Sequence, residues 1–253
     1  MDNTILKYLS VENFASFADK IEFTTEIDSG KKEFIESVFS CGDNQFNKVS
    51  FLYGANGSGK TFFCKIIREI QRLLEWSPLC GMNNSELLSL PQLKGMDDPI
   101  TTFAFDMSYE EKPTRFVVEI ILDGITYHYE FAVLNRKIEY ELLTKKYRRT
   151  EKLIERTSPS YKDIILKSDL KDFENTKQVV KALCLPIAAL LNNKMALKIN
   201  AAIKGICVVS MTAARLKPTN SKEAFSDERL AKYINILQKA DPTLRDIKVS
   251  FEE

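Results

Sequence analysis

Histidine and paired cysteines are scarce in this sequence of 253 residues, which has one histidine and five cysteines, none spaced as Cys-x-x-Cys. An odd number of scattered cysteines argues against a disulfide framework or a zinc site. An excess of one charge is also absent, since 36 basic and 35 acidic side chains leave a net charge of +1. Balanced charge gives no overall reason to expect nucleic-acid binding. We therefore expect a globular protein of the reducing cytoplasm.

Long apolar runs are missing as well. The longest, Leu183–Leu191, is about half the length of a membrane span and contains Pro186. The N-terminus has no basic segment followed by an apolar one, so it is not a signal peptide. We therefore expect no membrane partner.

Strands are predicted in three parts of the first 150 residues. Residues 5–25 and 100–147 alternate apolar and polar side chains, a pattern typical of half-buried strands. Asp123-Gly124 separates two alternating runs, which is the strongest short-range signal for a β-hairpin. The pattern of residues 100–147 therefore predicts an antiparallel meander. The apolar residues 48–54 predict a further strand, which should be buried.

Helices are predicted elsewhere. From residue 60 to about residue 78, apolar side chains recur at helical spacing and form one stripe. From about residue 150 the pattern becomes mainly helical, so the sequence divides into parts 1–150 and 151–253. Shorter helices are expected at residues 30–39, 174–185, 191–204 and 226–241.

The most informative segment is residues 54–61 (GANGSGKT), which matches the pattern G-x-x-x-x-G-K-[ST] between a predicted strand and a predicted helix. Glycines let the backbone curl so that successive N–H groups point at phosphate oxygens. The helix N-terminus adds a partial positive charge. We expect the Lys60 ammonium to reach the β- and γ-phosphates of a nucleoside triphosphate, and the Thr61 hydroxyl to ligate Mg²⁺. A plain glycine-rich turn would leave the Lys-Thr pair unexplained.

This loop does not identify the class of enzyme. A GTPase is excluded because no glycine has an aspartate three residues before it, and no Asn-Lys-x-Asp is present. A small-molecule kinase stays open, with Asp106 as its acid and residues 145–149 (KKYRR) as its lid. The absence of a regular βαβ pattern after the loop counts against that reading.

Two segments together resemble a known family. YLSVENFASFADKIEF (residues 8–23) and LYGANGSGKT (residues 52–61) are similar to the N-terminal lobe of ABC-type ATPases of the SMC and DNA-repair branch. The strands around Asp123-Gly124, with their Y-x-Y-x-F return, resemble the smaller subgroup called AAA family ATPases. Members of that subgroup occur in overcoming-lysogenization-defect-like and abortive-infection phage-defence systems.

The resemblance implies an α/β fold: a P-loop NTPase lobe of ABC-like type with a mixed sheet, an antiparallel β meander and a helical C-terminal part. Residues 1–150 would be the nucleotide-binding lobe, and residues 151–253 a mainly helical subdomain ending before a Walker B strand. The implied ligands are ATP and Mg²⁺. The residues that would bind them are Gly54, Asn56, Gly57, Ser58, Gly59, Lys60, Thr61 and Phe62, with Thr61 on the metal. Ser16 in the turn NFASF would lie near ribose and base, and Gln92 is the candidate Q-loop glutamine. For Phe14 and Phe17 a core position is preferred over packing on adenine.

Several family elements are not found in these 253 residues. Hydrolysis in the family needs an apolar strand ending in Asp-Glu, but Asp227-Glu228 lies in a polar segment. A signature serine-glycine motif is missing, and the single histidine, His128, belongs to the hairpin and is expected to be solvated. We therefore expect this chain, as a truncated, split or partial protein, to bind ATP weakly and hydrolyse it poorly.

The partners expected by resemblance are a second copy of the complete protein and a nuclease or toxin. Nucleic-acid binding stays open. A non-hydrolysing, nucleotide-dependent interaction module is the alternative reading.

Overall fold

The computed structural model describes residues 4–27, 35–42, 44–80, 99–135, 137–157, 164–166 and 182–208. In chain order the elements are β1 (Thr4–Glu12), β2 (Ile21–Thr24), the 3₁₀ helix η1 (Ile35–Ser37), β3 (Val38–Cys41), β4 (Asn44–Asn47), α1 (Lys60–Cys80), the 3₁₀ helix η3 (Met107–Glu111), β5 (Thr114–Leu122), β6 (Ile125–Leu134), β7 (Lys137–Lys146), β8 (Thr150–Arg156), β9 (Ile164–Leu166), α3 (Cys184–Leu190) and α4 (Lys194–Lys204). The predicted Gln92 and the predicted helix 226–241 lie outside the described residues.

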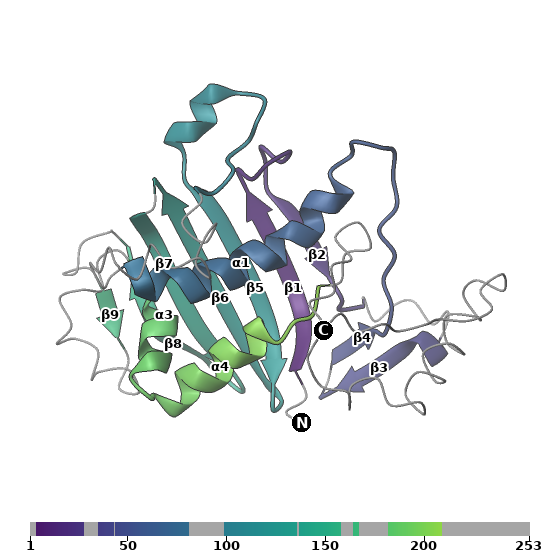
Figure 1. The fold of residues 1–253 in the computed structure, drawn as a ribbon. Coiled ribbons are helices and arrows are strands. Elements are labelled where there is room, and N and C mark those ends of the chain that lie inside the picture. Colours follow the sequence, from purple (N-terminus) through teal and green to yellow (C-terminus); the bar gives the residue numbers. More distant parts are fainter. Residues whose placement is uncertain are drawn as a thin grey trace, which may run out of the picture. The chain divides into compact units, whose positions relative to one another are not determined.

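The main sheet has seven strands in the order β2-β1-β5-β6-β7-β8-β9 (Figure 1), and β3 and β4 form a separate two-stranded sheet. The predicted N-terminal strands and the hairpin are confirmed, and β5 and β6 pair from Thr114↔Val133 to Leu122↔Ile125. Asp123 and Gly124 have φ values of +53° and +76°, the left-handed pair that a type I′ turn requires. β1 pairs with β5, which joins the N-terminal hairpin to the meander.

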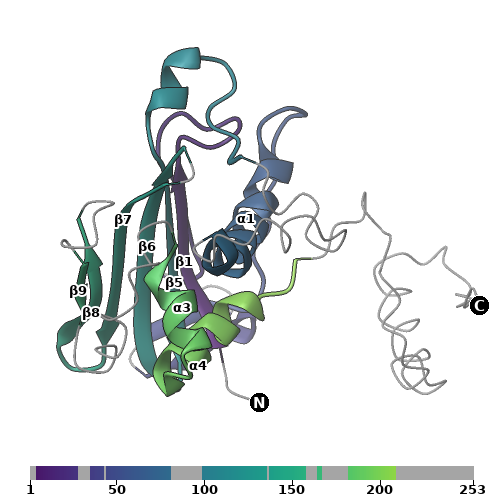
Figure 2. The same ribbon diagram turned by 60° about the vertical axis from the view of Figure 1, so that its left-hand side comes forward.

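Helices cover one face of this sheet (Figure 2). The predicted apolar stripe of α1 is confirmed, with Ile66 and Ile70 buried in the same cluster as Phe116 and Val118 of β5. Residues of α3 and α4 complete that cluster. The core therefore lies between the sheet and its helices. Burial of each such side chain stabilises the fold by about 1.5–3 kcal/mol.

The short helices follow from local chemistry. In α3, Pro186 lies in the first turn, where a backbone N–H would have no partner within the helix, so the ring is tolerated. α4 begins after Asn193, whose side chain accepts hydrogen bonds from the backbone N–H groups of Met195 and Ala196. The helix predicted at 191–204 is therefore confirmed.

A buried charged pair attaches α3 to the sheet. The Glu141 carboxylate of β7 accepts hydrogen bonds from the Tyr129 hydroxyl (2.9 Å) and from the backbone N–H groups of Cys184 (2.8 Å) and Leu185 (3.2 Å). Arg156 lies opposite Glu141 on β8 and donates to the Ala182 carbonyl at 3.0 Å. Burial raises the pKa of Glu141, and the hydrogen bonds and Arg156 oppose that rise.

Four predictions of secondary structure are wrong. Residues 48–54 form no strand, and Phe51 and Tyr53 are 86% and 91% exposed. An apolar strand of this kind needs both of its faces covered, and no described residues cover these side chains. Residues 101–106 are irregular and lead into η3, although they were expected in the meander. Of the helix expected at 30–39, the described residues from 35 onward form η1 and then β3, which pairs with β4. A change to helix was expected at residue 150, but residues 150–156 form β8, which pairs with β7 and extends the sheet past that position.

The mixed sheet is the fold prediction that the described residues do not support. Every strand pair among them is antiparallel. The chain is an α/β structure with an antiparallel sheet, as the meander implied.

Candidate functional site

The predicted phosphate loop leads directly into α1. Gly57 and Gly59 have φ values of +82° and +90°, which only glycine adopts without strain. The Ser58 N–H donates to the Ala55 carbonyl at 3.2 Å, and the Phe63 N–H donates to the Gly59 carbonyl at 3.0 Å, closing the first turn of α1. The loop therefore curls and ends at a helix N-terminus, as a phosphate site requires.

The Lys60 ammonium folds back over this loop. It donates to the carbonyls of Gly54 (2.7 Å) and Ala55 (2.6 Å) and lies 3.4 Å from the Ser58 hydroxyl. Lys60 forms no ion pair with any carboxylate of the described residues. Its charge is thus held by neutral carbonyls, and an anion entering the loop would be its first counter-ion.

The N-terminal turn NFASF, residues 13–17, packs against the phosphate loop. A Cβ atom at Gly59 would lie 2.7 Å from the Phe17 ring and 2.9 Å from the Ser16 hydroxyl oxygen, so the approach requires glycine. The Ser16 hydroxyl is buried and has no hydrogen-bond partner among the described residues. A buried hydroxyl without a partner costs free energy, and a ligand oxygen at the loop would remove that cost.

The other predicted site residues have different surroundings. Thr61 is exposed in the first turn of α1, and Phe62 is half-buried with the Lys65 ammonium 4.5 Å from its ring centre. Asn56 and Ser58 are exposed on the loop. Phe14 is buried and meets Phe116 edge to face at 5.7 Å, so the preferred core position is confirmed.

The structure also shows a long-range contact of this turn that the sequence did not suggest. Asn13, at a φ of +54°, donates its side-chain amide to the carbonyls of Tyr109 and Lys112, each at 2.9 Å. Its side-chain oxygen accepts from the Phe103 N–H at 2.9 Å. Ala15 adds two backbone hydrogen bonds, to Thr101 and Ala104. The turn that touches Gly59 is thus clamped to residues 99–113.

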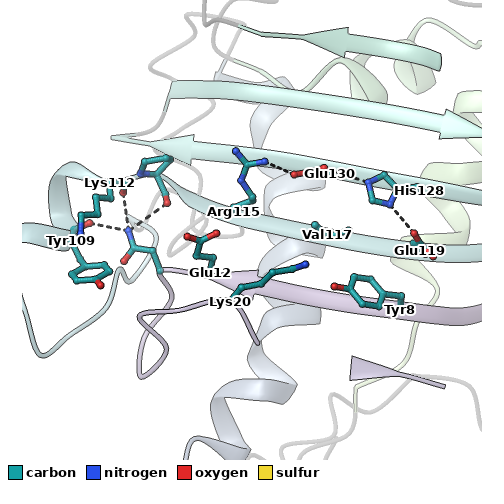
Figure 3. Close-up of a pocket in the computed structure, with 12 residues that line it drawn as sticks. Tyr8, Glu12, Lys20, Tyr109, Lys112, Arg115, Val117, Glu119, His128 and Glu130 are labelled. Atoms are coloured by element: carbon teal, nitrogen blue, oxygen red, sulfur yellow. Dashed lines mark hydrogen bonds and ion pairs between the residues drawn. The ribbon is translucent and has the colours of Figure 1, made fainter. Parts of the chain in front are cut away.

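A cavity of about 680 Å³ lies on the sheet face opposite the helices (Figure 3). His128 lies between two carboxylates there, with ring nitrogens 2.8 Å from Glu119 and 3.4 Å from Glu130. Glu130 also pairs with Arg115, and Lys7 lies near Glu119. Hydrogen bonding to Glu119 first, and then to Glu130, raises the pKa of His128 to about 9.

His128 is therefore more constrained than the expected solvated residue. The signal was present in the hairpin register, since a two-residue turn at Asp123-Gly124 places Glu119 directly opposite His128. The described residues contain no cluster of three or more potential metal ligands.

The two candidate kinase groups lie apart. Asp106 caps η3 by accepting from the Ser108 N–H at 2.9 Å, a hydrogen bond that lowers the pKa of its carboxyl group. Lys145 lies beside Tyr127, toward the other end of the sheet, and pairs with Glu151 at 3.2 Å. Asp106 and the 145–149 segment therefore do not form the acid and the lid of one kinase site.

The curled loop, its lysine and the helix that follows define a P-loop protein. Residues 49–178 match the family described as "AAA domain, putative AbiEii toxin, Type IV TA system", and the chain belongs to this family of AAA-type P-loop ATPases. The expected resemblance to AAA family ATPases of abortive-infection systems is confirmed. No curated protein and no solved structure matches the chain. No helix within the described ranges has the length and apolar character needed to cross a membrane.

Proposed function

We propose that this chain is the ATP-binding lobe of an ABC/SMC-like ATPase that acts in phage defence. The observation that carries the proposal is the Lys60 ammonium, which has no carboxylate partner among the described residues and lies within a loop shaped by two left-handed glycines. The buried Ser16 hydroxyl beside Gly59 supports it, since no described residue hydrogen-bonds to that hydroxyl.

The roles of the chain's own groups follow from their chemistry. Backbone N–H groups of residues 57–61 would bind phosphate oxygens, and Lys60 would exchange its carbonyl partners for the negative charge of the phosphates. Thr61, whose side chain is exposed at the start of α1, would ligate Mg²⁺. When bound, Mg²⁺ neutralises phosphate charge and orients the phosphate chain. Gly54, Asn56 and Phe62 would complete the loop, and Gln92 would be the Q-loop glutamine.

Hydrolysis by these 253 residues is expected to be slow. The only Asp-Glu pair does not follow an apolar strand, so no pair in the sequence is suited to position both metal and water. We place the chain in the cytoplasm, where the complete protein would form a dimer and act with a nuclease or toxin. The family's association with a type IV toxin–antitoxin system supports such a partner.

ATP binding is tested by titrating the 253-residue chain with Mg-ATP in a calorimeter. Lys60→Ala should weaken binding roughly 10- to 100-fold, because a hydrogen bond to a charged group contributes about 1.5–3 kcal/mol. Lys198→Ala is the matched control, since Lys198 is also a helical lysine but pairs with Asp123 at the β5–β6 turn. The proposal is wrong if the unchanged chain binds no ATP at millimolar concentration, or if both variants bind alike.

The alternative is a non-hydrolysing interaction module, which the lack of a suitable Asp-Glu pair favours. The two functions share ATP binding and differ in turnover. Phosphate release from ATP at an ordinary rate of about 1 s⁻¹ or more, abolished by Lys60→Ala, would reject the module and the expectation of slow hydrolysis together.

A further inference from the structure

An exposed aromatic ring lies on the segment that is hydrogen-bonded to the N-terminal turn, and this turn contacts the phosphate loop. Phe105 is 81% exposed, and the segment around it is fixed rather than free-standing. Its ring meets the Phe103 ring at 5.6 Å, and Phe103 meets Tyr109 at 5.1 Å, both edge to face. The Lys112 ammonium lies 3.7 Å from the Tyr109 ring centre. Phe103 thus supports one flank of Phe105, and Tyr109 supports Phe103, while most of the Phe105 surface faces solvent.

The backbone around Phe105 is tied to the turn that touches Gly59. Ala104, the preceding residue, donates its N–H to the Ala15 carbonyl at 2.8 Å, and Phe103 donates to Asn13 at 2.9 Å. Ser16 follows Ala15 and lies against Gly59. Consecutive Cα atoms are about 3.8 Å apart, so only a few residues separate the exposed ring from the phosphate loop. Figure 1 shows the turn and residues 99–113 at the same end of the sheet.

We propose that Phe105 is a stacking platform for the base of the nucleotide whose phosphates the loop holds. This inference rests on the proposed function. A single exposed phenylalanine needs no explanation by itself. This one is held in place by ring contacts and by the same turn that shapes the phosphate loop. A planar, apolar base attached to a phosphate chain is the ligand that matches a fixed, exposed ring beside a phosphate site.

The test compares two ligands, Mg-ATP and inorganic triphosphate with Mg²⁺, by calorimetry on the 253-residue chain. Triphosphate has the phosphates and no base. Phe105→Ala should weaken ATP binding roughly 5- to 100-fold, which corresponds to about 1–3 kcal/mol per stacked base, and leave triphosphate binding unchanged. Phe105→Trp should keep ATP binding within about threefold, because it keeps a π face. Phe105→Leu, which keeps apolar volume only, should resemble Phe105→Ala.

Tyr147 supplies the matched control. It is also a highly exposed aromatic residue, but it follows β7 at the other end of the sheet, where Lys146 pairs with Thr126. Tyr147→Ala should change neither ligand. Because Phe105 and Tyr147 are both exposed, neither variant should alter the thermal unfolding midpoint by more than about 1–2 °C.

Each other outcome overturns the inference. Unchanged ATP binding by Phe105→Ala rejects the platform, and if that variant instead loses self-association, the ring belongs to an interface between copies. Equal loss of ATP and triphosphate shows that Phe105 acts on the phosphate loop and not on the base. If the unchanged chain binds neither ligand, the proposed function fails as well, and this result is distinct from the loss of base stacking alone.

Discussion

Gly59 is the residue at which the phosphate loop and the N-terminal turn meet. Its φ of +90° and its missing Cβ are both needed, because the Phe17 ring and the Ser16 hydroxyl occupy the space that a side chain would take. The loop motif predicts the glycine from phosphate chemistry, and the structure adds a packing reason for the same residue.

Gly59→Ala is therefore expected to lower the free energy of unfolding by more than a left-handed backbone alone would. Strain of that kind costs about 1–3 kcal/mol. Gly42→Ala is the control, since Gly42 has a φ of +60° and no atom within 4 Å of the added Cβ. Urea unfolding of both variants measures the difference. Equal losses would show that Phe17 and Ser16 move aside and that the contact is not tight.

His128 gives the second prediction for a single residue. Its pKa is raised from the ordinary value of 6.5 to about 9, so the folded state binds the proton more tightly than the unfolded state. The resulting stability is fully present below pH 6.5 and is lost as the pH rises through about 9. The charged groups around the ring are Glu119, Glu130 and, next to them, Lys7, Arg115 and Lys146.

The measurement is urea unfolding of the unchanged chain and of His128→Gln at pH 6, 7.5 and 9.5. At pH 6 the histidine should contribute on the order of 2 kcal/mol over glutamine, and the difference should shrink toward zero at pH 9.5. A difference independent of pH would mean that His128 stabilises the sheet through packing and not through its charge.

At the scale of elements, a bulge explains why the sequence did not reveal Glu141. In the pattern KIEYELL, Glu139 and Glu141 alternate with apolar residues and look solvent-facing. β7 pairs Ile138 with Val133 but Tyr140 with Ala132, so one extra residue lies between them. After that extra residue, each side chain of β7 points to the face opposite the one that plain alternation predicts. Glu141 therefore points into the core. Single-sequence patterns do not show bulges, whereas the turn at Asp123-Gly124 is a local signal and was predicted.

Glu141→Ala should therefore be among the most destabilising changes in the sheet. Removing it leaves Arg156 buried opposite an empty site and removes acceptors from Tyr129 and the start of α3, at a cost of about 3–5 kcal/mol. Glu155→Ala, on the more exposed face of β8 in a pair with Lys152, should cost no more than about 1 kcal/mol.

Chemical denaturation monitored by far-UV circular dichroism compares the two variants. If Glu141→Ala does not fold, Glu141→Gln, which keeps a side-chain acceptor, should fold with a smaller loss. Similar small losses for positions 141 and 155 would show that water reaches the pair and that it is not a buried anchor.

At the scale of the whole molecule, features set by neighbouring residues were predicted correctly, and features set by contacts between distant residues were not. The phosphate loop, α1 and the β5–β6 hairpin depend on neighbouring residues, so periodicity and turn chemistry predicted them. The failure at residues 48–54 has a different cause, because apolar character predicts a buried strand only where a sheet can accept it. Likewise, the hydrogen bonds of Asn13 to residues 99–113 join positions about ninety apart in the sequence. A pattern of neighbouring residues cannot predict such a contact.

The pairing of β1 with β5 has a consequence for synthesis on the ribosome. β1 is made before β5, and its partner residues, from Arg115 to Leu122, emerge about a hundred residues later. At a translation rate of about 5–20 residues per second, β1 waits roughly 5–20 s for β5. During that interval β2 can already cover one edge, since Tyr8 pairs with Thr24 through a short local connection. The other edge of β1 stays unpaired until β5 is made, and an unpaired strand edge is a site at which a nascent chain can aggregate.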